Sequence, residues 1–123
     1  ISAGETTTYI NNNDHIKGHG GPSQEMVLSF AMASKDLKEA CLLSIDSEGT
    51  DGTTPDAGAI SDGASLKVAE KKELNLNSSL MDHASYEALL SMGDVVITGN
   101  TGTNLCDFNV LYIDTQEERS QTK

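Results

Sequence analysis

Runs of apolar residues separated by polar and glycine-rich segments predict a chain in which strands alternate with helices. The β-branched and aromatic residues among positions 1–10 indicate a first strand. Positions 23–34 are so largely apolar that we expect a helix buried on more than one side, with Gly21 or Ser23 as its N-cap. The unbroken apolar run at 41–45 is typical of a buried strand in a parallel sheet.

The second half of the chain continues this pattern. A turn-rich segment at 47–56 leads to a predicted helix over 57–72 that is capped by Asp56, although Gly58 and Gly63 weaken it. After irregular structure at 75–79 we expect, in order, a short helix capped by Asp82 or Ser85 and ended by Gly93, a strand at 95–98, a strand at 108–113 and a polar tail at 114–123. The sequence therefore predicts a single α/β domain with a mixed or mostly parallel sheet and flanking helices.

Three loops between these elements carry residues that suit a ligand. They span 18–22, 46–56 and 98–104, and we expect them to converge, because functional loops gather at the carboxyl ends of strands in such sheets. The third loop, Thr98-Gly99-Asn100-Thr101-Gly102-Thr103-Asn104, offers N–H and hydroxyl groups that suit a phosphate or a small hydroxy acid. The alternative is a tight connection without a ligand, since no Lys follows Gly102 as in a Walker-type loop.

Composition narrows the classes of partner. The 123 residues include 8 Lys and Arg against 19 Asp and Glu, and the net charge of −11 opposes binding to nucleic acid or to anionic membranes. No long apolar run predicts a membrane span and no basic start followed by an apolar run predicts a signal peptide, so we expect a cytoplasmic protein. Because the chain begins at Ile1 inside a predicted strand, we expect it to be part of a longer or processed protein. We expect Cys41 and Cys106 to be buried free thiols.

Carboxylates concentrate between positions 46 and 62. They supply hard oxygen ligands that suit magnesium, and they are Asp46, Glu48, Asp51, Asp56 and Asp62. The alternative for each is a turn, a helix cap or a solvent-exposed position. The histidines His15, His19 and His83 show no metal-ligand spacing, and Ser44, Ser47 and Ser61 lack the context of a nucleophile elbow, so we expect ordinary surface residues.

Taken together and in order, several motifs resemble the MOFRL domain, the carboxyl-terminal domain of glycerate kinases that phosphorylate the 2-hydroxyl. The motifs are Ser2-Ala3-Gly4-Glu5-Thr6-Thr7, Gly18-His19-Gly20-Gly21-Pro22-Ser23-Gln24-Glu25, Gly49-Thr50-Asp51-Gly52, Asp56-Ala57-Gly58-Ala59, and residues 98–104 followed by Asp107. The resemblance implies that residues 1–113 form this domain, that residues 114–123 are a tail, and that an amino-terminal Rossmann-like domain is absent from this chain.

The resemblance also implies a reaction, the transfer of the ATP γ-phosphate to D-glycerate with magnesium, in a cleft shared with the amino-terminal domain. Glu5 and Asp51 are the implied catalytic residues, with Asp51 also a candidate metal ligand. The implied phosphate and substrate contacts are Gly20, Gly21, Thr101, Thr103, Asn104 and Asp107. The fragment alone is expected to be inactive, and the oligomeric state is left open, a homo-oligomer included.

Three alternatives stay open. The family also carries the label hydroxypyruvate reductase, although no Gly-x-Gly-x-x-Gly dinucleotide motif is present. The chain could instead be a non-catalytic folding or assembly module, or an acidic cation-binding domain. The second alternative is motivated by a departure from the family pattern, in which arginines stand at the positions of His19 and Pro22. Because phosphoryl transfer needs positive charge, either the cation comes from elsewhere, such as Lys17 or the missing domain, or the chemistry of this protein is weakened or altered.

Overall fold

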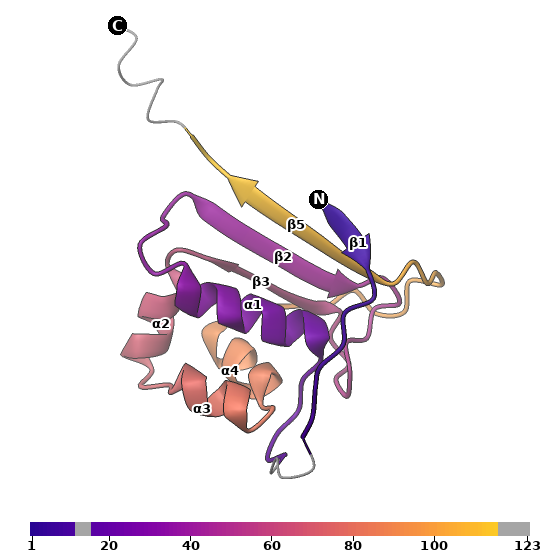
Figure 1. The fold of residues 1–123 in the computed structure, drawn as a ribbon, viewed down its shortest axis with the longest axis horizontal. Helices are drawn as coiled ribbons and strands as arrows, with labels where there is room; N and C mark the ends of the chain where they lie inside the picture. The colour runs from indigo at the N-terminus through magenta and orange to yellow at the C-terminus, as the bar shows by residue number, and fades with distance from the viewer. Residues whose placement is uncertain (12–15, 116–123) are drawn as a thin grey trace, which may run out of the picture.

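The computed structural model describes residues 1–11 and 16–115. The elements follow one another as β1 (Ser2–Gly4), α1 (Pro22–Ala33), β2 (Ala40–Asp46), β3 (Gly58–Asp62), α2 (Ser65–Lys71), α3 (Leu76–Met81), α4 (Ser85–Met92), β4 (Val95–Val96) and β5 (Asp107–Ile113). They form a sheet with the four helices gathered on one side of it, so the domain has two layers (Figure 1). The predicted α/β class is confirmed.

The sheet has the strand order β1-β5-β2-β3-β4, and each of its four neighbouring pairs is antiparallel. The mostly parallel arrangement in the prediction is therefore wrong. Since every second strand in such a sheet runs the same way, β1, β2 and β4 all end at one edge, where β3 and β5 begin. This end of the sheet is the loop edge.

The core lies between α1 and the centre of the sheet. Leu42 of β2 and Ala59 of β3 face the helices, where they meet fully buried side chains of α1 and α4, namely Val27, Leu28 and Leu89. The largely apolar α1 begins after Gly21, which the sequence named as a candidate N-cap, and its first residue is Pro22, whose missing N–H costs nothing at that position. Helix α1 therefore packs in the core and has its first residue at the loop edge.

The structure corrects several predicted elements. The helix expected at 57–72 is wrong over its first half, where β3 forms instead, and the segment at 75–79 is mostly helical as part of α3. The first strand is only β1, and α4 starts after Ala84 without a side-chain cap, not after Asp82 or Ser85. Gly93 ends α4 in the left-handed conformation at φ 78°, as expected.

Expectations for single side chains also need correction. Cys106 is exposed and Cys41 is only half-buried, although both are free thiols. Ser44, Ser47 and Ser61 are buried rather than on the surface. His15 and the tail from residue 116 onward lie outside the described residues. Within the described ranges, no helix has the length and apolar character that crossing a membrane requires.

Candidate functional site at the loop edge

The three loops singled out in the sequence meet at the loop edge. Thr101 donates its backbone N–H to the carbonyl of Glu48 at 3.3 Å, which joins the loop after β4 to the loop after β2. Thr53 donates its N–H to the carbonyl of Gly20 at 3.1 Å, which joins the loop after β2 to the segment before α1. The predicted convergence is confirmed, and its cause is the alternation of strand direction rather than a parallel sheet.

Two adjoining depressions lie at this edge. The first, here called the acidic hollow, has a volume of about 250 Å³ and is lined by ten residues that include five carboxylates, Glu5, Asp46, Glu48, Asp51 and Asp107. The second, the loop hollow, has a volume of about 440 Å³ and is lined by Glu48, Thr50, Asn100, Gly102, Thr103 and Asn104. Glu48 and Asn104 line both. No Lys, Arg or His is among the described residues that line either hollow.

Asp51 holds the start of α1. Its side chain is 1% exposed, and its two carboxylate oxygens accept the backbone N–H groups of Ser23 at 3.2 Å and Gln24 at 2.9 Å. Burial raises the pKa of Asp51, the hydrogen bonds from α1 oppose this shift, and the nearby Asp107 adds to it. A carboxylate from a distant loop therefore caps this helix, whose own N-cap residue, Gly21, has no side chain to do so.

The close fit around Asp51 explains Gly21. A Cβ atom at position 21 would lie 2.5 Å from the Asp51 Cγ atom, closer than non-bonded atoms can approach. A Cβ at Gly20 would collide with the Ser85 hydroxyl of α4. Both glycines thus let the loop before α1 pass between α4 and the Asp51 loop.

Asp107 ties the chain after β1 to the start of β5. Its Oδ2 atom accepts the backbone N–H of Thr6 at 3.0 Å and the Thr6 hydroxyl at 2.6 Å, and the side chain is 6% exposed. Glu5, the residue before Thr6, is exposed and lines the acidic hollow. Asp107 therefore fixes where the Glu5 carboxylate can lie.

Ser47 fastens the loop after β4. Its hydroxyl accepts the N–H of Leu105 at 2.7 Å, its carbonyl accepts the Thr101 hydroxyl, and its N–H donates to the carbonyl of Cys106 at 3.0 Å. The Thr101 hydroxyl is thus used inside the domain. The Thr103 hydroxyl has no partner among the described residues, and the Asn104 side-chain oxygen accepts the N–H of Cys106 at 3.2 Å. Thr103 and the Asn104 amide nitrogen remain as donors toward the hollows.

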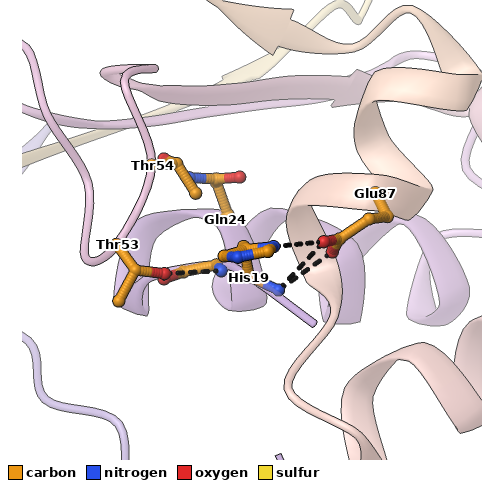
Figure 2. Close-up of polar contacts among 6 residues, drawn as sticks. His19, Gln24, Thr53, Thr54 and Glu87 are labelled. Atoms are coloured by element: carbon orange, nitrogen blue, oxygen red, sulfur yellow. Dashed lines mark hydrogen bonds and ion pairs between the residues drawn. The ribbon is translucent and has the colours of Figure 1, made fainter. Parts of the chain in front are cut away.

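The positions where the family pattern has arginines are filled differently here. Figure 2 shows the His19 ring pointing at Glu87, with 2.6 Å between Nδ1 and Oε1, while the His19 backbone N–H also donates to this carboxylate. Burial alone would raise the pKa of Glu87, but the hydrogen bonds from His19 lower it below its ordinary value. Lys17, the other candidate cation, pairs with Asp82 at 3.4 Å. Neither His19 nor Lys17 lines the two hollows.

Beside His19, the tip of the Asp51 loop is held by polar contacts that the sequence did not indicate. The Gln24 amide nitrogen donates to the Thr54 hydroxyl at 2.7 Å, and these two side chains lie next to each other in Figure 2. The Thr53 hydroxyl lies 3.3 Å from the carbonyl of Gly20. Gln24 is fully buried. These contacts join segments about 30 positions apart, and no local sequence signal announces such pairs.

Some carboxylates of the acidic segment after β2 are bound or buried within the domain, and others line the acidic hollow. Asp46 and Asp62 accept backbone N–H groups two residues further on, as turn residues do, and Asp56 is buried ahead of β3 rather than capping a helix. In the part of the chain that the structure describes, no three His, Cys, Asp or Glu side chains lie close enough to hold a metal ion. The carboxylates of the acidic hollow fit a magnesium ion only in the common mode in which phosphates and water complete its shell.

Fold and site together define a class, an α/β domain whose loops at one end of the sheet form two adjoining polar hollows. Comparison with known proteins identifies the family. The model of the MOFRL family matches residues 1–107, and the chain belongs to that family.

Individual relatives and a solved structure support the same family. A glycerate 2-kinase of Pyrococcus horikoshii is 38% identical over 98% of this chain and 26% of its own length. A putative hydroxypyruvate reductase of Agrobacterium vitis is 33% identical over 92% of this chain and 25% of its own. The crystal structure of a glycerate kinase from Thermotoga maritima matches 90% of this chain and 26% of its own with a TM-score of 0.83 and 37% identity. The chain thus spans about a quarter of the length of these relatives.

Proposed function

We propose that this chain is the part of a glycerate 2-kinase that binds the acceptor substrate, and that the rest of a longer protein supplies the ATP site. The observation that carries the proposal is the pair of hollows at the loop edge, which offer carboxylates, hydroxyls and amides but no cation. An acidic surface on its own repels any anion, and the highly charged triphosphate of ATP far more than the single carboxylate of glycerate. The positive charge for phosphoryl transfer therefore has to come from outside the residues that line the two hollows.

The exposed donors of the loop hollow suit D-glycerate. In the proposed complex, the Thr103 hydroxyl and the Asn104 amide nitrogen donate hydrogen bonds to the glycerate carboxylate. Gly20 and Gly21 line neither hollow, and the N–H and carbonyl of Gly20 are bound to Thr53, so the phosphate contacts expected of these two glycines stay a prediction. Thr101 and Asp107 hold the loops in place through Ser47 and Thr6. This division follows from which groups already have partners inside the domain.

Glu5 is the proposed general base. Its carboxylate takes the proton from the 2-hydroxyl of glycerate, that oxygen forms a bond to the γ-phosphorus of ATP, and the bond between this phosphorus and the bridging oxygen breaks, which releases ADP. Asp51 acts in this scheme mainly by holding the start of α1, and its role as a metal ligand stays a prediction. Glu48, which lines both hollows, would hold a magnesium ion together with the phosphates, and the ion would neutralise phosphate charge.

Two other functions are weighed against this one. The first is a reductase activity, because some relatives are named putative hydroxypyruvate reductase. The described part of the domain offers no dinucleotide loop for it. A non-catalytic assembly module is favoured by the replacement of both family arginines at His19 and Pro22.

The decisive experiment measures product formation from D-glycerate and ATP with magnesium. The 123-residue chain and a longer polypeptide extended upstream of Ile1 are compared, with NMR detection of 2-phosphoglycerate. We expect turnover only in the longer form. A folded longer form that makes no product would favour the assembly module, and oxidation of NADH or NADPH with hydroxypyruvate would favour the reductase.

A further inference from the structure

The sheet has a second apolar face that none of the helices in the described part of the chain covers. The register of the strands places Leu43 of β2, Ile60 of β3 and Val110 of β5 side by side on the face opposite the helices. Their neighbours on that face, alternate residues of the same strands and of the edge strands, are Ala3, Cys41, Ile45, Gly58, Asp62, Val96, Phe108 and Tyr112. Asp62 is the one charged residue among these positions, and the set is called the open face below.

The side chains of the open face are in contact with water. Ile60 is 41% exposed and Tyr112 is 61% exposed, while Leu42 and Ala59 on the helix side are 8% and 0% exposed. The strands are apolar at successive positions, which is the pattern of a sheet covered on both faces. A contiguous apolar surface of this kind marks an interaction site.

Part of the edge of β5 is left without a partner strand among the described residues. β5 pairs with β2 along its whole length, from residue 107 to 113, but with β1 only at residues 107–109. Residues 110–113 therefore present an unpaired backbone edge on the β1 side, and Leu111, Tyr112 and Ile113 are more than half exposed. The antiparallel register pairs Ser2 with Asn109, so an extension of β1 upstream of Ser2 would run along this edge.

We propose that the open face is the docking surface for the polypeptide upstream of Ile1, which extends β1 along β5 and then covers the face with a layer of its own. The relatives have about three-quarters of their length outside the matched segment, which is enough chain for such a layer. A second copy of this chain is disfavoured, because each copy carries a net charge of −11. The inference rests on the proposed longer protein but not on its catalytic activity.

The test compares the 123-residue chain with the longer polypeptide, each carrying Ile60→Lys. In the longer form we expect the melting temperature to fall by roughly 5 °C, because the lysine is placed in an apolar interface. In the 123-residue chain, where Ile60 faces water, the shift should stay within about 2 °C. Ile60→Thr keeps a β-branched side chain and serves if the lysine variant does not fold. It should lower the melting temperature by a smaller amount, and again by more in the longer form than in the 123-residue chain.

The matched control is Leu90→Lys on α4, a position 49% exposed, which should leave both forms unchanged. Equal shifts in both forms, no shift in the longer form, or a reading frame without an upstream polypeptide would overturn the proposal. So would sedimentation of the 123-residue chain as a dimer that Ile60→Lys dissociates. Because melting needs no turnover, an inactive longer form with the expected shifts would refute the kinase and leave the docking surface standing.

Discussion

At the scale of single residues, the Asp51 carboxylate connects the loop that lines the acidic hollow to helix α1 of the core. It accepts two backbone N–H groups at the start of α1 from within a buried position. Asp51→Ala should lower the free energy of unfolding by about 2 kcal/mol, since two buried donors lose their acceptor. Urea denaturation measures the change.

The control for Asp51 is Glu48→Ala in the same loop. Glu48 is exposed and its side chain caps no helix, so its loss should change stability by less than about 0.5 kcal/mol. Equal stabilities for the two variants would show that the cap does not contribute as the geometry indicates.

Thr101 and Thr103 lie two positions apart but use their hydroxyls differently. Thr101 donates to the carbonyl of Ser47 inside the domain, whereas the Thr103 hydroxyl has no partner among the described residues. Thr101→Val should cost about 1 kcal/mol in stability, and Thr103→Val less than about 0.5 kcal/mol.

In the longer protein, activity should depend more on Thr103 than on Thr101, which is the reverse of their expected effects on stability. If Thr103 donates to the substrate, Thr103→Val lowers kcat/KM by roughly 10²-fold, as loss of a well-placed donor does. Unchanged kinetics in a folded Thr103→Val variant would remove this residue from the site.

At the scale of elements, Gly58 lies where β3 packs closely against β2. The sequence predicted a helix from residue 57, but Gly58 starts β3, where an added Cβ atom would collide with the carbonyl oxygen of Ser44 in β2. A Cβ atom there has no room. Gly58→Ala should therefore destabilise the domain by about 3 kcal/mol, the upper range for overpacking, as measured by urea denaturation.

Gly4 provides a matched control, because it lies in the edge strand β1 and an added Cβ would meet open space. Gly4→Ala should change stability by less than about 0.5 kcal/mol. A small effect of Gly58→Ala would mean that β2 and β3 can separate locally without loss of pairing.

How far the sequence predicts this fold depends on how local the signal is. The apolar runs of α1, β2 and β5 and the stop at Gly93 can be read from neighbouring residues, and these predictions are confirmed. The strand at β3 is set by its pairing with β2 and β4, so its helical propensity is overridden by tertiary contacts. The same distinction holds at the site, where Asp51 was found from its motif but Ser47 acts through distant backbone groups.

At the scale of the whole molecule, buried carboxyls make stability depend on pH. Burial raises the pKa of Asp51, Asp56 and Asp94 above the ordinary 3.8, and Asp94 accepts hydrogen bonds from Ser61 and Ser65 that only partly oppose the shift. A folded state that binds protons more tightly than the unfolded state loses stability as pH rises from about 3.8 through the raised pKa values.

Unfolding in urea should therefore require a higher concentration at pH 5 than at pH 7, and the smaller net charge at pH 5 acts in the same direction. Glu87 acts the other way, because its pKa is lowered and its contribution is lost as pH falls. Asp94→Asn should weaken the pH dependence. A urea midpoint that rises from pH 5 to pH 7 would contradict the conclusion that burial raises the pKa values of these carboxyl groups.

The pairing of β1 with β5 has a consequence for the order of folding. Thr6 and Asp107 are 101 positions apart, so β1 leaves the ribosome long before its partner strand exists. The β2–β3 hairpin and α1 can assemble in the meantime, whereas contacts of such long range form slowly. Glu5 therefore reaches its place only when synthesis of β5 is complete, which leaves the nascent chain without an assembled acidic hollow until then.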